Sequence, residues 1–169
     1  MNGSLPVNKL NAMPNLDLII KALNTAHWEL GEAFKNLPDE DVWKRAHPSL
    51  LSVGELAAHM AYWEARSILG EGTIQCLLCE KAAQYYTTNA PAPFQLPLNA
   101  EQTYAELTRV HDACKNWLTE NPRDSEDPNP NRQGWTWGMT LEYQAFHLAY
   151  HTGQIYSVRH LLGHETEDN

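Results

Sequence analysis

Two histidines stand four residues apart in the stretch "FHLAYHTGQI", which begins at Phe146. On a helix this spacing places His147 and His151 on one face, one turn apart. Two imidazoles so placed can share a metal ion at the ~2.0–2.1 Å typical of Zn–N bonds. The same face carries residues that favour the interior: Gln144, Leu148, Ile155, Val158 and Leu162. Because buried unpaired polar groups are costly, the pair needs either a metal or hydrogen-bond partners.

The residues between the two histidines argue against one common kind of metal site. A zincin peptidase has the motif His-Glu-x-x-His, in which the glutamate is the general base. Here the intervening residues are Leu148, Ala149 and Tyr150, so that base is missing. A peptidase is therefore disfavoured.

His59 is the best candidate for a third ligand. It lies on the apolar stripe of an expected helix, flanked by small residues that allow close approach of a partner helix. A lone histidine there is more often a hydrogen-bonded core residue, but a histidine pair on another inward face favours the metal hypothesis. Three histidines leave a position open for water or substrate, as in catalytic zinc sites. His27 is the next candidate, as a fourth ligand, a group behind the ligands or a pocket acid or base, although an ordinary histidine role is favoured for it.

The hydrophobic pattern predicts four long helices that would position these residues. Apolar residues step by three and four from Leu16 to about Leu37. The sequence "SVGE" at Ser52 is a capping box and predicts a helix to about Leu69. Asn99 can cap a third helix, and Thr140 can cap a last helix that ends before Gly163. We therefore predict an all-α fold, a four-helix bundle.

The connections before the third and fourth long helices are expected to be long. Residues 71–98 contain "IQCLLCEKAAQYY", a candidate short helix, followed by the proline-rich "NAPAPFQLP". The polar stretch "TENPRDSEDPNPNRQGW" precedes the last helix and should be a loop, of a length that is often functional or mobile. Residues 1–14 are expected to form an arm, and residues 1–169 to form one domain.

Charge and cysteine content narrow the classes of function. The chain has 12 basic and 21 acidic residues and a formal charge of −9, which disfavours nucleic acid as a partner. No apolar run is long enough for a membrane span, and no signal peptide is evident. Three cysteines without an export signal favour a cytoplasmic location. Cys76 and Cys79 form a CxxC, but two small apolar residues on a short helix are favoured over a redox pair or zinc ligands.

Aromatic and basic residues gather around the start of the last helix. Trp135, Trp137, Tyr143 and Tyr150 serve either in packing or as a pocket wall above the metal, and these two interpretations are evenly balanced. Arg132 and Arg159 could pair with a substrate carboxylate, although a solvated surface role is favoured for both.

The histidine pattern resembles that of the DinB-like (YfiT-like) superfamily. That family has one histidine on the second helix and His-x3-His on the last, often followed by Gly-Gln. His59, His147 and His151 match its metal ligands, and Gly153 and Gln154 match the trailing pair. The resemblance implies a four-helix bundle that binds a divalent ion, usually zinc or nickel, often as a homodimer. Some relatives are thiol-dependent S-transferases or isomerases that use low-molecular-weight thiols, and others look like hydrolases.

Two hypotheses about function follow. In the first, the protein is a cytoplasmic metalloenzyme in which three histidines hold an ion that activates a thiol or water for transfer or hydrolysis of a small-molecule substrate. In the second, it is a non-catalytic metal-binding or stress-response bundle that dimerises. The proline-rich segments before helices three and four depart from the family pattern, so neither hypothesis names a substrate.

Overall fold

The computed structural model describes residues 16–88 and 94–166, so the expected arm at residues 1–14 lies outside the described part. The described residues form five α-helices and one short 3-10 helix, η1 (Asp39–Asp41). The α-helices are α1 (Leu16–Phe34), α2 (Val53–Ile68), α3 (Leu77–Thr88), α4 (Ala100–Glu120) and α5 (Trp137–Leu161). Apart from one isolated bridge between Pro128 and Thr136, these described segments contain no β-structure, and the all-α prediction is confirmed.

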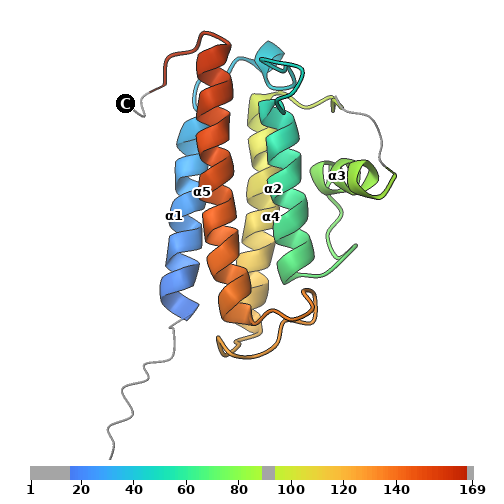
Figure 1. Ribbon diagram of the computed structural model, residues 1–169, viewed down its shortest axis with the longest axis vertical. Helices are drawn as coiled ribbons and strands as arrows, with labels where there is room; N and C mark the ends of the chain where they lie inside the picture. Colours follow the sequence, from blue (N-terminus) through green and yellow to red (C-terminus); the bar gives the residue numbers. More distant parts are fainter. Residues whose placement is uncertain (1–15, 89–93, 167–169) are drawn as a thin grey trace, which may run out of the picture.

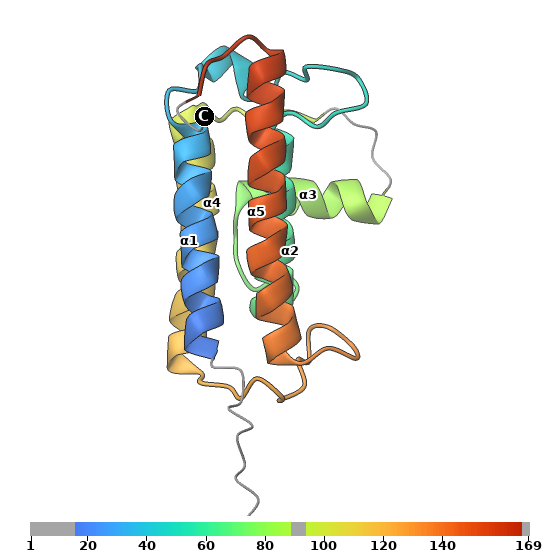
Figure 2. The same cartoon turned by 60° about the vertical axis from the view of Figure 1, so that its left-hand side comes forward.

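Four of the helices form the bundle, and the fifth lies across it. Helices α1, α2, α4 and α5 run along the long axis of the molecule, whereas α3 lies crosswise beside α2 (Figures 1 and 2). Helix α3 contacts α2 and α4, and α5 packs mainly on α1 and also on α2. The short helix expected within residues 71–98 is therefore present, attached to the outside of the bundle.

Helix α2 begins as the sequence predicts. The Ser52 hydroxyl accepts a hydrogen bond from the amide of Glu55, and the Glu55 carboxylate accepts one from the amide of Ser52. The guanidinium of Arg45 donates to both oxygens of the same carboxylate, at 2.6 and 2.7 Å. This buried, bidentate pair fixes the start of the helix that carries His59.

The ends of α1 and α5 differ from the predictions. Helix α1 ends at Phe34 rather than near Leu37, because the chain turns at Asn36, which has a left-handed φ of 57°. Helix α5 begins at Trp137, and its cap is Thr136, whose hydroxyl accepts from the amide of Met139. The prediction that Thr140 is the cap was wrong, since its hydroxyl instead donates to the carbonyl of Thr136, one turn earlier in the helix.

The polar segment between α4 and α5 is a loop, as predicted, but it is firmly attached to the bundle. The buried side-chain amide of Asn129 donates to the carbonyl of Ser67 and to the hydroxyl of Thr140. Asn131 donates to the carbonyl of Ile68. These bonds satisfy carbonyls at the end of α2, which have no partner within their own helix. The loop thereby joins the end of α2 to the start of α5.

The interior between the helices is mostly apolar, with large side chains such as Leu30, Met60, Leu107, Leu148 and Ile155 fully buried, but it also contains polar groups such as Glu64 and His111. Within the described residues, no helix is both long and apolar enough to cross a membrane.

Candidate metal centre

The structure brings His59, His147 and His151 together. His59 comes from α2, and the other two come from adjacent turns of α5. One ligand nitrogen from each residue lies within 4.8 Å of the other two. The Nε2 atoms of His59 and His147 are 2.9 Å apart, and the ring centroid of His151 lies 4.5 Å from each of the other two rings. The i, i+4 spacing that suggested a shared ion therefore does place the rings side by side.

Gln154 orients the third ring. Its side-chain oxygen lies 2.6 Å from Nδ1 of His151, so Nδ1 carries the proton and donates. The lone pair of His151 is then on Nε2, the nitrogen available as a ligand. The side-chain amide of Gln154 also donates to the hydroxyl of Tyr150. Metal-binding histidines commonly have such a partner on the second nitrogen.

Burial keeps the three imidazoles neutral. Desolvation, with the charge of His151 adding to it, lowers the pKa of His59 to about 4. Desolvation and the charges of His151, His59 and Arg132 lower the pKa of His147 to about 3. Burial also lowers the pKa of His151, against the hydrogen bond that its Nδ1 donates to Gln154, which favours the charged form. Neutral imidazole is the form that binds a metal.

The donor set fits a divalent ion. Two nitrogens bound tetrahedrally at ~2.0–2.1 Å would be about 3.3 Å apart, close to the separation of His59 and His147. The buried Nδ1 of His147 has no hydrogen-bond partner among the described residues. Three nitrogen ligands from one side suit zinc or nickel better than the oxygen-seeking magnesium or calcium.

A cavity of about 520 Å³ opens beside the histidines. Its walls come from α2, from α5 and from the loop before α5. The lining residues are His59, Trp63 and Ser67 of α2; Arg132 of the loop; and Tyr143, Gln144, Phe146, His147, Tyr150 and His151 of α5. This volume lies in the range of about 300–1,000 Å³ that holds small ligands.

The expected pocket residues fall into two groups. Tyr143 and Tyr150 line the cavity, and Gln154 lies directly behind His151. Trp137 and His27 are not among the lining residues. Trp137 is buried at the start of α5 with its ring 5.3 Å from that of Trp117, because its indole fills the end of the bundle.

His27 belongs to a second histidine cluster, formed by α1, α2 and α4. Its ring is stacked on that of His111, with centroids 4.0 Å apart. His111 contacts the carboxylate of Glu64 through Nδ1, at 2.7 Å, and the side-chain oxygen of Asn24 through Nε2, at 3.0 Å. The inward orientation expected of His27 is correct, but it leads into this closed cluster and away from the cavity.

Some cavity residues were not predicted, although the spacing that places them was present. His59, Trp63 and Ser67 are four residues apart, as are Tyr143, His147 and His151. Both rows line the cavity, because side chains at i and i+4 share a helix face. Phe146 is 62% exposed and lies at the mouth. Arg132 was considered as a partner for a substrate carboxylate, with a solvated surface role favoured, and the structure places it on the loop among the residues that line the cavity.

Among the described residues, the three cysteines belong to no group of metal ligands. Cys76, Cys79 and Cys114 are all buried and free. The hydrogen bond with Cys76, together with burial, raises the pKa of Cys79 well above its ordinary value. In the described part of the chain, the histidine trio is the only group arranged to hold a metal.

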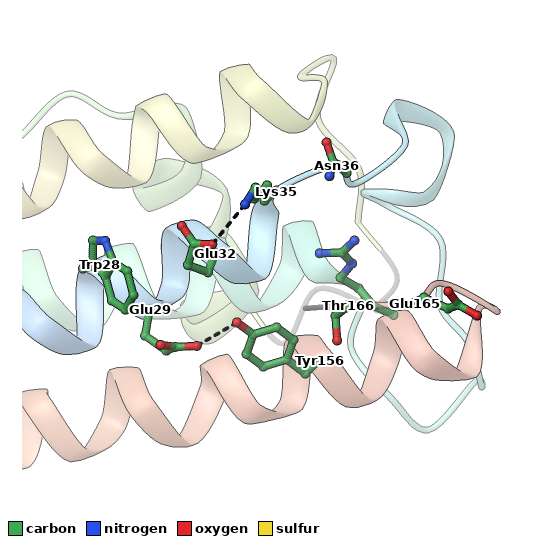
Figure 3. Close-up of a pocket in the computed structure, with 9 residues that line it drawn as sticks. Trp28, Glu29, Glu32, Lys35, Asn36, Tyr156, Glu165 and Thr166 are labelled. Carbon is green, nitrogen blue, oxygen red and sulfur yellow. Dashed lines mark hydrogen bonds and ion pairs between the residues drawn. The ribbon is translucent and has the colours of Figure 1, made fainter. Parts of the chain in front are cut away.

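A second hollow, of about 240 Å³, lies between α1, α5 and the segment after α5 (Figure 3). Two of its three carboxylates are engaged, since Glu29 accepts from the hydroxyl of Tyr156 and Glu32 lies 3.5 Å from Lys35. Arg159 lines it but is 2% exposed and donates to the carbonyl of Ala33, so the solvated role expected for Arg159 is wrong. This hollow has no set of metal ligands.

The fold and the site together define an all-helical bundle with a three-histidine cluster beside a cavity. A sequence profile of the DinB family matches residues 13–168, and the chain belongs to the DinB family. A solved structure of a conserved protein from Enterococcus faecalis is similar, with 17% sequence identity and a TM-score of 0.62 over 90% of this chain and 100% of that chain. At this identity the likeness shows the fold alone. Among curated proteins, no match was found.

Proposed function

We propose that this protein is an enzyme that depends on a divalent metal ion, held by His59, His147 and His151. The observation that carries the proposal is that three neutral imidazoles, of which His147 is buried and the other two are half-buried, meet at the wall of a cavity of ligand size. No carboxylate takes part in the cluster, so zinc or nickel is the preferred ion.

The side chains at the site would have the following roles. Three histidines hold the ion and leave its remaining positions toward the cavity, while Gln154 fixes the tautomer of His151. When bound, the ion would act as a Lewis acid and lower the pKa of a thiol or water in the open position. The aromatic side chains Trp63, Tyr143 and Phe146 would exclude water from a bound substrate. Thiol-dependent S-transfer, with a low-molecular-weight thiol as cosubstrate, and hydrolysis are the two reactions that this arrangement serves.

The test is the metal content of the purified, untagged protein, measured by mass spectrometry. We expect about one ion per chain in the wild type and none in His59→Ala or His151→Ala. His160→Ala is the matched control, since His160 is exposed on the same helix and contacts only Thr166 among the described side chains. Retention of the ion in His151→Ala would overturn the proposed site.

A second function is favoured by one observation. No Asp or Glu is found among the described residues that line the cavity, so a carboxylate acid or base is lacking there. A non-catalytic metal-binding or stress-response bundle, active as a homodimer, needs none. A metal-loaded protein that shows no turnover with thiol-acceptor and ester panels would favour this function, whereas metal-dependent turnover lost in His151→Ala would favour the enzyme.

A further inference from the structure

Arg132 is held at the cavity by the loop that carries it. The neighbouring side chains of Asn129 and Asn131 are bonded to the end of α2, and the amide of Arg132 donates to the carbonyl of Asn129. The carbonyl of Arg132 in turn accepts from the amide of Trp135. The backbone of Arg132 is therefore fixed before any ligand arrives.

The guanidinium of Arg132 is covered by aromatic rings. Its central carbon lies 3.6 Å from the ring centroid of Trp135 and 4.9 Å from that of Tyr143. Within residues 16–88 and 94–166, it has no ion-pair or hydrogen-bond acceptor, unlike Arg45 with its buried carboxylate. Stacked rings cover the faces of a guanidinium but leave its N–H edge available for an acceptor.

No acidic residue lies beside Arg132 in the described lining of the cavity, although the chain carries −9 overall. An adjoining hollow of about 240 Å³ shares Trp63, Ser67 and Arg132, and its described lining has no acidic residue either. The second cation of that hollow, Arg66, differs from Arg132 because it lies 3.9 Å from a carboxylate oxygen of Glu71. The hollow of Figure 3 differs, because three glutamates line it.

We propose that the cavity takes an organic monocarboxylate, whose carboxylate is bound by the N–H edge of Arg132 and whose apolar part lies against Trp63, Tyr143 and Phe146. A carboxylate matches the planar fork of a guanidinium with two parallel hydrogen bonds. Arg132 is the one Lys or Arg among the described lining residues, which suits a single negative charge better than a phosphate dianion. This assignment rests on the proposed function, since it orients the rest of the substrate toward the three histidines.

The experiment compares matched pairs of ligands by calorimetric titration. Phenylacetate, 3-phenylpropanoate and 4-phenylbutanoate are each compared with the corresponding neutral amide, on zinc-loaded and on metal-free protein. We expect wild type to bind at least one carboxylate about tenfold or more tightly than its amide. Arg132→Gln should abolish this preference and leave the metal content unchanged.

Arg123→Gln is the matched control. The Arg123 guanidinium also lies over an aromatic ring, 5.5 Å from the centroid of Trp117, but it does not line the cavity. This variant should keep the carboxylate preference. No preference in wild type, including no binding of any carboxylate, would overturn the assignment, as would a preference that survives in Arg132→Gln.

The two proposals can fail separately. A carboxylate preference that depends on Arg132 in the metal-free protein supports the anion site even if no metal binds. A stoichiometric metal with no such preference supports the metal site and rejects the anion site.

Discussion

Two histidine clusters lie inside the same bundle, and they differ in the groups that contact the histidine rings. His111 of the closed cluster is bonded to Glu64 and Asn24 and stacked on His27. In the open cluster, His59 and His147 face each other, and His151 is bonded to Gln154 beside a cavity. The first cluster uses a buried carboxylate from its own chain, whereas no carboxylate of the described residues takes part in the second.

This difference separates structural from ligand-binding histidines. Both clusters leave some buried polar atoms without a hydrogen-bond partner among the described residues: Nε2 of His27 and Oε2 of Glu64 in the closed cluster, and Nδ1 of His147 in the open one. The clusters differ in that His111 is held by the side chains of Glu64 and Asn24, whereas His59, His147 and His151 gather their rings beside a cavity that a ligand can enter. We therefore expect changes in the closed cluster to alter stability and changes in the open cluster to alter metal binding.

The largest expected effect is on stability, in the closed cluster. His111→Leu leaves the carboxylate of Glu64 fully buried without its imidazole, and should lower the free energy of unfolding by about 3–5 kcal/mol. The double variant Glu64→Leu/His111→Leu should recover much of this loss, because neither buried polar group remains unpaired. Urea unfolding of the metal-loaded proteins measures both. A double variant no more stable than His111→Leu would contradict the role of the pair.

The second effect is a pH dependence of the free energy of unfolding that is caused by His27. Burial, with the charge of His111 adding to it, lowers the pKa of His27 to about 4. The unfolded chain, with a histidine pKa of about 6.5, then binds a proton that the folded protein does not, so stability falls as the pH falls from 6.5 to 4, by about 3 kcal/mol.

His27→Phe should remove this part of the pH dependence. His59 and His147 titrate in the same window in metal-free protein, so the measured quantity is the difference between wild type and variant in urea unfolding from pH 7 to pH 4.5. The control variant is His160→Phe, at an exposed position, and its free energy of unfolding should depend on pH as in the wild type. Parallel curves for wild type and His27→Phe would show that His27 does not titrate as expected.

The third effect is a loss of thermal stability when the metal is removed. With free zinc at about 100 times its dissociation constant, binding should stabilise the protein by about 2.7 kcal/mol, so a chelator should lower Tm by about 5–10 °C. His147→Ala should show no response to the chelator, whereas His111→Leu should keep the full response from its lower Tm. Differential scanning calorimetry measures both, and equal responses in wild type and His147→Ala would remove the distinction between the clusters.

The smallest effect tests the residue behind the ligands. Gln154→Ala removes the acceptor for Nδ1 of His151 and should weaken zinc binding about 10–100-fold, or about 1.4–2.7 kcal/mol. Ser157→Ala is the control, because Ser157 is exposed on the same helix and its hydroxyl donates only to the carbonyl of Gly153. Competition with a coloured zinc chelator measures the affinity, and an unchanged affinity in Gln154→Ala would exclude this role.

The positions of the helices could be predicted well, because capping residues and hydrophobic periodicity are visible within a few neighbouring residues of the sequence. The capping residues Ser52 and Asn99 and the short helix α3 are present as expected, whereas the crosswise orientation of α3 was not predicted. The start of α5 was misplaced by four residues, since Thr136 and Thr140 offer the same hydroxyl and only tertiary contacts with Asn129 distinguish them.

Only those residues of the site whose positions follow from helical periodicity could be predicted from the sequence. Spacing placed His147 beside His151, and the stripe on α2 placed His59 inward. The partners of His27 come from helices distant in the sequence, and Arg132 reaches the cavity through bonds made by its loop. Such contacts depend on how the elements are packed, which short-range patterns do not encode.

The separation of the ligands along the chain has a consequence for biosynthesis. His59 and His147 are 88 residues apart, so the site does not exist until α5 has been synthesised and has packed beside α2. At about 5–20 residues per second, a nascent chain would expose His59 for several seconds before its partners are made. Under the proposed function, metal uptake would therefore be a late event that follows assembly of the bundle, and a bound ion would mark chains that have finished folding.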